Sequence, residues 1–291
     1  MTATLASSTA VPAAPRAPSA RPSSAAVRAV GASISLMALF LVGFVAYLYG
    51  LSGVAEQSGQ RNLRGEFGAA LKDAVAPDGP TQAGRPVAIL HLPRIGLPDA
   101  VVVEGTTAGQ LTKGPGHRAD TVLPGQAGVS VIYARAATFG APFARLMNLR
   151  PGERFTVTTG QGLATYVVAS FGDGYHPAPA SSPNRLVLTT ADSGYIPRMT
   201  VSVSAELVGQ PQPAATGRPG ITGAEQGLAQ DTDALVPLLL WTQVFLLVVV
   251  AAAFAGNRWA RLPTYLCFTP IVLACAWNVY ENLAGLLPNV Y

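Results

Sequence analysis

Three long stretches of the chain are almost wholly apolar. They cover residues 29–51, 234–256 and 263–287, although the third becomes more polar after Trp277. Each is long enough to cross the hydrocarbon core of a bilayer as a helix. We therefore predict three transmembrane helices, one before and two after a long central region.

The arginines beside these stretches predict how the chain is oriented. Three precede the first stretch and two lie in the loop between the second and third: Arg16, Arg21, Arg28, Arg258 and Arg261. Cytoplasmic flanks carry the excess of Lys and Arg, and both sets are cytoplasmic only if residues 52–233 lie outside. The predicted location is the cell membrane, multi-pass, with the N-terminus cytoplasmic and the central region and C-terminus extracytoplasmic.

The segment before the first stretch has a different composition. Residues 1–28 are mainly Ala, Pro, Ser and Thr with scattered Arg, too poor in large apolar groups to fold, and we predict a disordered cytoplasmic tail. The alternative is that the first stretch is a cleaved signal peptide, with Gly53-Val54-Ala55 as its small-residue site. Its apolar run exceeds the roughly 7 to 15 residues usual for such peptides, which favours a retained helix.

The central region changes from a helical to a strand-like pattern. Within residues 52–84, Leu63, Phe67, Ala70 and Leu71 recur at helical spacing and predict a juxtamembrane amphipathic helix followed by a linker. Residues 85–208 then hold seven short β-rich runs: 87–92, 100–104, 129–133, 154–159, 164–170, 185–190 and 199–205. Turn residues separate them, with Gln161-Gly162 as a hairpin turn, which predicts an all-β sandwich or closed barrel. Residues 209–233, rich in Gly, Pro, Ala and Gln, predict a flexible linker back to the membrane.

Composition excludes several kinds of chemistry. Of the 291 residues, 49% are hydrophobic and 12% charged, more apolar than one soluble domain needs. Both cysteines, Cys267 and Cys275, fall in the third apolar stretch, so we expect no disulfide, no thiol nucleophile and no cofactor in the central region. The three scattered histidines have no metal-ligand spacing, so no metal is expected. The net charge of +4 is spread out, which argues against nucleic acid as a partner.

Four segments of the central region resemble motifs of the sortase family. They are Leu92-Pro-Arg-Ile-Gly-Leu97, Val103-Glu-Gly-Thr106, Leu111-Thr-Lys-Gly-Pro-Gly-His-Arg-Ala-Asp-Thr-Val-Leu-Pro-Gly-Gln-Ala-Gly128 and Thr138-Phe-Gly-Ala-Pro-Phe-Ala-Arg-Leu-Met-Asn-Leu-Arg-Pro-Gly152. The third keeps the family spacing L-x-x-G-x-G-H-x-x-x-T-x-L-P-G-x-x-G throughout. The resemblance covers roughly residues 56–207 and is nearest to class E, which has a single N-terminal anchor. It implies a sortase-like β-barrel outer domain with one N-terminal and two C-terminal transmembrane helices.

The resemblance also implies where catalytic residues would stand. Sortases are membrane-anchored cysteine transpeptidases that cleave a sorting signal and join it to a cell-wall amine. Where the family has V-I-A-G-H-R this chain has Val131-Ile-Tyr-Ala-Arg-Ala136, and where it has L-x-L-x-T-C this chain has Leu186-Val-Leu-Thr-Thr-Ala191. Arg135 and Ala191 therefore stand at the catalytic His and Cys positions. The family arginine corresponds to Arg198 or to Thr200.

Few residues near these positions offer a replacement for the lost chemistry. The hydroxyls of Thr189, Thr190 and Ser193 need a base, and Arg135 stays protonated. Asp192 is a possible base, or a turn residue that caps its own backbone or pairs with an arginine. His117 matches a family histidine that is not catalytic, and we interpret it as structural.

Binding is the chemistry that remains open. Guanidinium groups of Arg135 and Arg198 suit a carboxylate or phosphate, so an extended peptide or an anionic envelope polymer is a candidate ligand, with Asp192, Thr190 and His117 as further candidate contacts. Asp192 neutralising one arginine is the alternative.

Three functions fit these observations. The leading hypothesis is a catalytically inactive sortase-like membrane protein that acts as a binding or scaffolding subunit in cell-envelope assembly or secretion, with the bilayer and an envelope or membrane protein as partners. The alternative is an enzyme, hydrolase or transpeptidase-like, that uses non-cysteine chemistry on a sortase frame. A sensor is a third possibility, but the cytoplasmic parts are only a tail and a short loop.

Overall fold

A computed structural model describes residues 24–180, 182–192, 197–258 and 261–290. It divides the chain into two compact units, Met1–Gly43 and Phe44–Tyr291. Residues 1–23 of the disordered tail predicted for residues 1–28 lie outside the described residues, whereas residues 24–28 are helical, so the first apolar helix begins before the predicted boundary. The described part of the first unit belongs to helix α1 (Ser24–Ala46).

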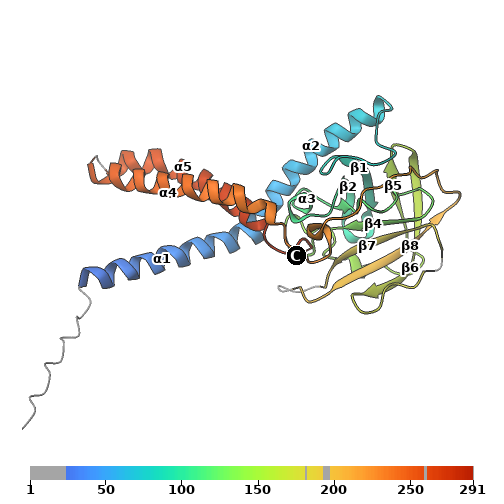
Figure 1. Ribbon diagram of the computed structural model, residues 1–291, viewed down its shortest axis with the longest axis horizontal. Helices are drawn as coiled ribbons and strands as arrows, with labels where there is room; N and C mark the ends of the chain where they lie inside the picture. The colour runs from blue at the N-terminus through green and yellow to red at the C-terminus, as the bar shows by residue number, and fades with distance from the viewer. Residues whose placement is uncertain (1–23, 181, 193–196, 259–260, 291) are drawn as a thin grey trace, which may run out of the picture. The chain divides into compact units, whose positions relative to one another are not determined.

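A closed β-barrel forms the outer part of the second unit (Figure 1). Around the barrel the described strands follow the order β1-β2-β3-β4-β7-β8-β6-β5. Their bounds are β1 Pro86–Leu92, β2 Leu97–Glu104, β3 Gly116–His117, β4 Val129–Tyr133, β5 Arg154–Thr159, β6 Gly162–Asp173, β7 Arg185–Ala191 and β8 Thr200–Val208. Of the two predicted all-β architectures, a sandwich and a closed barrel, the closed barrel is confirmed. β3 was missed because a two-residue strand has no detectable alternation.

Alternation along the strands fills the barrel. In β4, for example, Ile132 is fully buried in the core while its neighbours are partly exposed. Apolar side chains of most strands meet there, including Leu90, Val102, Phe155, Tyr166, Leu186, Leu188 and Val203. The one-sided burial is what a period of two predicts. Phe155 and Tyr166 stack with ring centroids 5.6 Å apart.

One turn differs from its predicted position, and one strand glycine has a clear structural role. The β5–β6 hairpin turns at Gly160 and Gln161, because Gly162 already pairs with Thr159. The turn predicted at Gln161-Gly162 was therefore one residue late. Gly116 in β3 has a different role, since a Cβ atom there would lie 2.3 Å from the carbonyl oxygen of Gly105. Only glycine permits this close approach of two backbone segments.

Helix α2 (Ser52–Lys72) follows a π-helical turn, η1 (Tyr47–Leu51), and packs on the barrel. Leu63 lies against Val101 and Val103 of β2. The side chain of Gln60 is buried, where its Nε2 donates to the carbonyl of Val101 (3.0 Å) and its Oε1 accepts from the amide of the same residue (2.8 Å). The predicted amphipathic helix is thus anchored by apolar contacts and by a paired amide.

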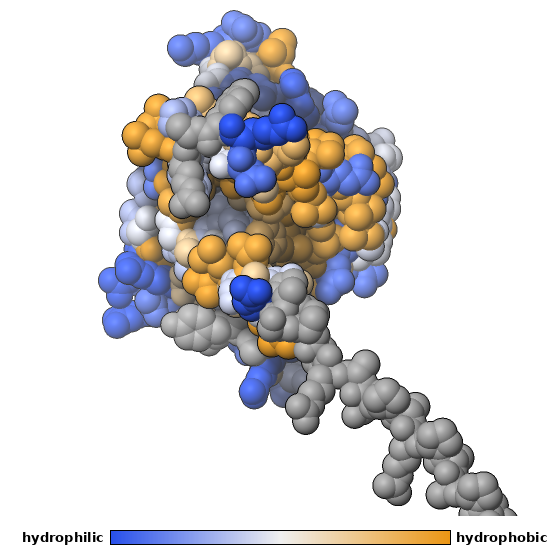
Figure 2. Space-filling view, turned by 90° about the vertical axis from the view of Figure 1, so that its left-hand side faces the viewer, coloured by the Kyte–Doolittle hydropathy of each residue, from blue (hydrophilic) through white to orange (hydrophobic). Residues whose placement is uncertain are grey.

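Two apolar helices, α4 (Leu235–Arg258) and α5 (Arg261–Ala284), form a hairpin (Figure 1). Together with the helical stretch that starts at Val30, they make three helices, among the described residues, that are long and apolar enough to cross a membrane. Large side chains such as Leu247 and Leu266 are 70% and 78% exposed. Figure 2 faces this end and shows a broad hydrophobic surface. An apolar surface of this kind is satisfied by lipid, so the chain associates with a membrane.

The segment between barrel and hairpin packs on the barrel. Gln212 exchanges backbone hydrogen bonds with the Gly125–Ala127 turn, donating to Gly125 (2.8 Å) and accepting from Ala127 (2.9 Å). Farther along, the 3₁₀ turn Gly223–Glu225 brings the Glu225 carbonyl to the buried Thr106 hydroxyl, which donates to it at 2.7 Å. The composition of residues 209–233 led us to expect a flexible linker, but these long-range contacts fix its path. A second 3₁₀ turn, Thr232–Ala234, leads into α4.

Candidate functional site

The candidate site lies where the parallel strands β4 and β7 end. Tyr133 pairs with Thr189 at the end of the ladder. The register continues beyond it, because the amide of Ala134 donates to Thr189 (3.1 Å) and the Thr190 hydroxyl donates to the carbonyl of Ala134 (2.8 Å). Arg135 follows β4 by two residues, and Ala191 is the last residue of β7.

Arg135 is fully buried at this strand end. Its guanidinium donates to the carbonyl of Ala108 (3.1 Å) and to the Thr138 hydroxyl (3.3 Å), and it lies 5.0 Å from the centroid of the Phe139 ring. Burial lowers the pKa of Arg135 to about 10, because removing a cation from water disfavours its charged form. The group remains a cation at neutral pH, so it cannot accept a proton as a general base.

An aromatic cluster covers Arg135 on the side of the helices. The Tyr47 ring, in η1, lies 6.3 Å from Phe139 and 5.0 Å from Trp277 of α5, edge-on to both. The amide of Phe139 also donates to the hydroxyl of Ser52 at 2.9 Å. Edge-to-face rings at these distances pack favourably. Residues that are far apart in sequence therefore shield the guanidinium from water.

Ala191 is also covered, by a different part of the chain. Only 3% of its surface is exposed. It packs in an apolar cluster with Leu111, at the end of the short helix α3 (Ala108–Leu111), and with Val290 near the end of the described chain. Thr200 is its direct partner across the β7–β8 ladder. The methyl group offers no nucleophile, and the space above it is filled.

Asp192 and Arg198 bracket the loop that joins β7 to β8. Oδ1 of Asp192 accepts from the backbone amides of Arg198 (2.9 Å) and Met199 (3.3 Å). This carboxylate therefore closes its own turn, one of the two interpretations that the sequence left open. Arg198 is exposed, and Thr200 is the residue opposite Ala191. Ser193, a candidate hydroxyl, lies outside the described residues.

His117 belongs to a buried polar pair rather than to the strand ends. Its Nδ1 faces Oε2 of Glu104 at 2.8 Å, and its Nε2 lies 2.9 Å from the carbonyl oxygen of Val122. A carbonyl only accepts hydrogen bonds, so Nε2 donates to Val122, and Nδ1 shares a hydrogen bond with the carboxyl group of Glu104. Both side chains are almost fully buried. This hydrogen-bonded pair ties β2 to β3 and engages both ring nitrogens of His117.

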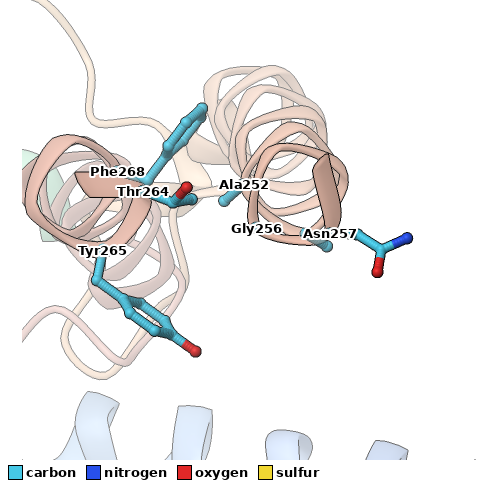
Figure 3. Close-up of a pocket in the computed structure, with 7 residues that line it drawn as sticks. Ala252, Gly256, Asn257, Thr264, Tyr265 and Phe268 are labelled. Carbon is cyan, nitrogen blue, oxygen red and sulfur yellow. The ribbon is translucent and has the colours of Figure 1, made fainter. Parts of the chain in front are cut away.

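Two hollows lie outside the strand ends. One, of about 460 Å³, borders the aromatic cluster and is lined by Phe139, Trp277, Lys113 and Glu281 among others. The other, of about 400 Å³, lies between α4 and α5, where Figure 3 shows Tyr265 and Phe268 beside small residues such as Gly256. Small residues at a helix contact are typical of close packing in membranes. The lining of this second hollow has no carboxylate, imidazole or cation.

The β6–β7 loop is held by a carboxylate. Oδ1 of Asp173 accepts from the amides of His176 (2.7 Å) and Tyr175 (2.8 Å). The hydrogen bond from His176, followed by that from Tyr175, lowers the pKa of Asp173, because both stabilise the charged form.

Sequence reasoning missed several residues of this site. Glu104 lies in the family-like segment Val103-Glu-Gly-Thr106, but the segment does not predict its contact with His117, because only folding places the two side by side. Tyr47 looks like one apolar residue of a membrane span, and Val290 like part of a chain end. Their proximity to the strand ends depends on contacts over long sequence separations.

Fold and site together define a class of protein: a closed barrel whose candidate site lies at the ends of two parallel strands, on a chain with helices long and apolar enough to cross a membrane. The sequence model described as Sortase domain matches residues 90–203. This chain belongs to the sortase family.

Solved structures of sortases resemble the chain to different degrees. Sortase E from Streptomyces avermitilis is 31% identical, over 45% of this chain and 93% of that one, with a TM-score of 0.39. Sortase E1 from Streptomyces coelicolor, solved with a tripeptide in its active site, is 24% identical over the same shares, also with a TM-score of 0.39. The sortase D5 transpeptidase of Clostridium perfringens is 19% identical over 52% and 99% of the two chains, with a TM-score of 0.43. No curated protein matches the chain.

Proposed function

We propose that this protein is a catalytically inactive member of the sortase family, a pseudoenzyme that serves as a binding or scaffolding subunit in cell-envelope assembly or secretion. The observation that carries the proposal is that Ala191 stands where the resemblance to sortases puts the nucleophile, and that a buried Arg135 stands where it puts the catalytic histidine. Cysteine transpeptidation needs a thiolate to form the thioacyl intermediate and an acid to protonate the leaving group. A methyl group supplies neither function, and a buried guanidinium is held by its own contacts.

Neighbouring groups do not replace these functions. The Thr190 hydroxyl donates its proton to the carbonyl of Ala134, and Asp192 accepts two backbone amides. A hydroxyl nucleophile needs a base within hydrogen-bond reach of its proton. No contact among the described residues favours the alternative of non-cysteine chemistry on the sortase frame.

The membrane helices support the scaffolding part of the proposal. The hairpin of α4 and α5 exposes apolar side chains along its length, which gives it a surface for a membrane-protein partner as well as for lipid. The arginines that flank the spans support a topology with the barrel and the C-terminus outside the cell and the N-terminus in the cytoplasm. The partner is then an envelope or membrane protein.

Arg198 supports a role in binding anionic groups. It is exposed at the edge of the site and its backbone is fixed by Asp192, so its guanidinium is available for a carboxylate or phosphate of a peptide or envelope polymer. Arg135, in contrast, is fully buried, so a ligand in solution does not reach its guanidinium.

The inactivity is tested with the purified full-length protein, sorting-signal peptides and an amine acceptor. We expect no cleavage and no transfer. Cleavage that is lost in Asp192→Ala would overturn the proposal in favour of the non-cysteine enzyme.

The scaffolding role is tested by crosslinking in native membranes and co-purification of the full-length chain. We expect a stable protein partner whose recovery falls in Arg198→Ala. Arg145→Ala, which removes another exposed arginine of the barrel, is the matched control and should retain it. A chain that is recovered alone, as a monomer, would contradict the role.

A further inference from the structure

The last described residues of the chain are seated against the candidate site. Asn289 and Val290 are both fully buried, although they follow α5, whose apolar side chains are largely exposed. The Val290 side chain packs on Ala191 and Leu111, and the amide of Ala136 donates to the carbonyl of Val290 at 3.3 Å. This segment therefore covers the position at which a sortase nucleophile would stand.

Residues 289 and 290 occupy a position on the protein that we call the seat. Its polar side is formed by the backbone carbonyls of Thr106, Gln226 and Ala229, and it recognises a carboxamide. Nδ2 of Asn289 donates to two backbone carbonyls, those of Thr106 (2.8 Å) and Gln226 (2.6 Å), and its backbone amide donates to Ala229 (2.9 Å). The two carbonyls accept and cannot donate. A side chain with an N–H₂ group fits between them, whereas an isosteric carboxylate would place negative charge against both oxygens.

The walls of this seat come from two sources. Thr106, Leu111 and Ala191 belong to the barrel, whereas Gln226 and Ala229 belong to the segment that joins the barrel to α4. That segment is itself fixed by the hydrogen bond from Thr106 to Glu225. The seat is thus a pocket of this chain and not of the barrel strands alone.

The seat has one imperfection. Oδ1 of Asn289 is buried and has no hydrogen-bond partner among the described residues. A buried acceptor without a partner is destabilising, so the segment is held less firmly than its contacts alone would allow. A ligand that exchanges must be held weakly enough to leave, and the unsatisfied Oδ1 weakens the binding of this segment.

We propose that the pocket between the strand ends and residues 226–229 is a peptide-binding site, and that residues 288–290 are its resident intramolecular ligand. The preferred ligand is a short peptide with asparagine followed by a β-branched apolar residue. The inference rests on the proposed function, because a thiolate enzyme would need the space that Val290 fills. Release of the resident segment opens the pocket to such a peptide from a partner.

Thiol accessibility tests the covering. Ala191→Cys is made in the full-length chain with Cys267→Ser and Cys275→Ser, so that it carries the single thiol, and its rate of reaction with a charged maleimide is measured in detergent micelles. Asn289→Asp, which removes two donated hydrogen bonds, should raise this rate about tenfold or more, since each 1.4 kcal/mol is a factor of ten. Asn148→Asp, an exposed residue of the barrel, is the matched control and should leave the rate unchanged.

Peptide protection tests the binding. A capped peptide Leu-Leu-Pro-Asn-Val, the sequence of residues 286–290, should slow labelling of the Asn289→Asp variant, and the same peptide with Asp for Asn should not. Equal labelling rates with and without Asn289→Asp would overturn the covering. Fast labelling that the peptide does not slow would overturn the binding site.

A second measurement does not depend on the introduced thiol. Hydrogen–deuterium exchange of the unaltered chain should show protection of the Ala136 and Asn289 amides, with loss of protection in Asn289→Asp. Rapid exchange of both amides in the unaltered chain would overturn the proposal. Neither measurement involves the partner or turnover, so failure of the pocket and failure of the proposed function give different results.

Discussion

The burial of Arg135 makes a quantitative prediction about stability. Its pKa falls from the ordinary 12.5 to about 10, which corresponds to roughly 3 kcal/mol by which burial disfavours the cation. Arg135→Met removes this penalty and keeps most of the volume. It leaves the Ala108 carbonyl and the Thr138 hydroxyl without a donor from this side chain, at about 1 kcal/mol each. Loss of the contact with the Phe139 ring costs about 1 kcal/mol more, so we expect the Met variant to be about as stable as the unaltered chain, as replacement of buried ionic groups by apolar ones often is.

Arg135→Ala separates electrostatics from packing. It relieves the same burial of charge but opens a cavity under Phe139, and loss of a large buried side chain costs about 3 to 5 kcal/mol. We therefore expect the Ala variant to be roughly 3 kcal/mol less stable than the Met variant. Pulse proteolysis of the full-length chain in micelles, across a urea series, measures both, because the protease cuts the unfolded barrel while the micelle protects the spans. A Met variant as unstable as the Ala variant would refute the reasoning and show that the guanidinium contacts outweigh its desolvation.

Three further predictions concern the barrel. Glu104→Gln should lower the free energy of unfolding by about 2 kcal/mol, because it disturbs the buried hydrogen bond between Glu104 and Nδ1 of His117; an unchanged midpoint in the same urea series would contradict a stabilising role for this pair. Gly116→Ala should destabilise by about 2 kcal/mol or more through its clash with a backbone carbonyl, whereas Gly65→Ala in α2, which has open space around it, should be neutral or stabilising. The hydrogen bonds that fix the β6–β7 loop should be fully formed at a pH above the ordinary pKa of Asp173, and they should be lost as the pH falls through its lower folded pKa. Amide chemical shifts in an acid titration measure this change. Shifts that also titrate in Asp173→Asn would refute the assignment.

The local pattern of apolar and polar residues was sufficient to predict most of the helices and strands of this protein. Uniform apolarity over more than 20 residues has few structural solutions other than a membrane helix, and the alternation of the central region permits only half-buried strands. The motif from Leu111 to Gly128 added the family. β3 and the one-residue position of the β5–β6 turn were missed, because short strands and tight turns are decided by hydrogen bonds to partners elsewhere in the chain.

The candidate site shows a sharper division. The identities of Arg135 and Ala191 are properties of the sequence, and so is the absence of a cysteine outside the third apolar stretch. Their environment is not, since a guanidinium that looked available for an anionic ligand is sealed beneath Phe139 and Tyr47. Burial depends on which distant segments pack together, and no local pattern encodes that.

By itself, then, the sequence determined that this chain has three apolar helices, an all-β central region of sortase type and no nucleophilic thiol there. Only the tertiary structure decided what occupies the strand ends. The residues that fill them are Tyr47, from the turn after the first apolar helix, and Val290, from beyond the last helix. Packing brings them there across about 90 and about 100 positions of sequence. Such contacts are selected by the closure of the whole barrel and its helices, because the loss of chain entropy on joining distant segments is offset only when many contacts form together.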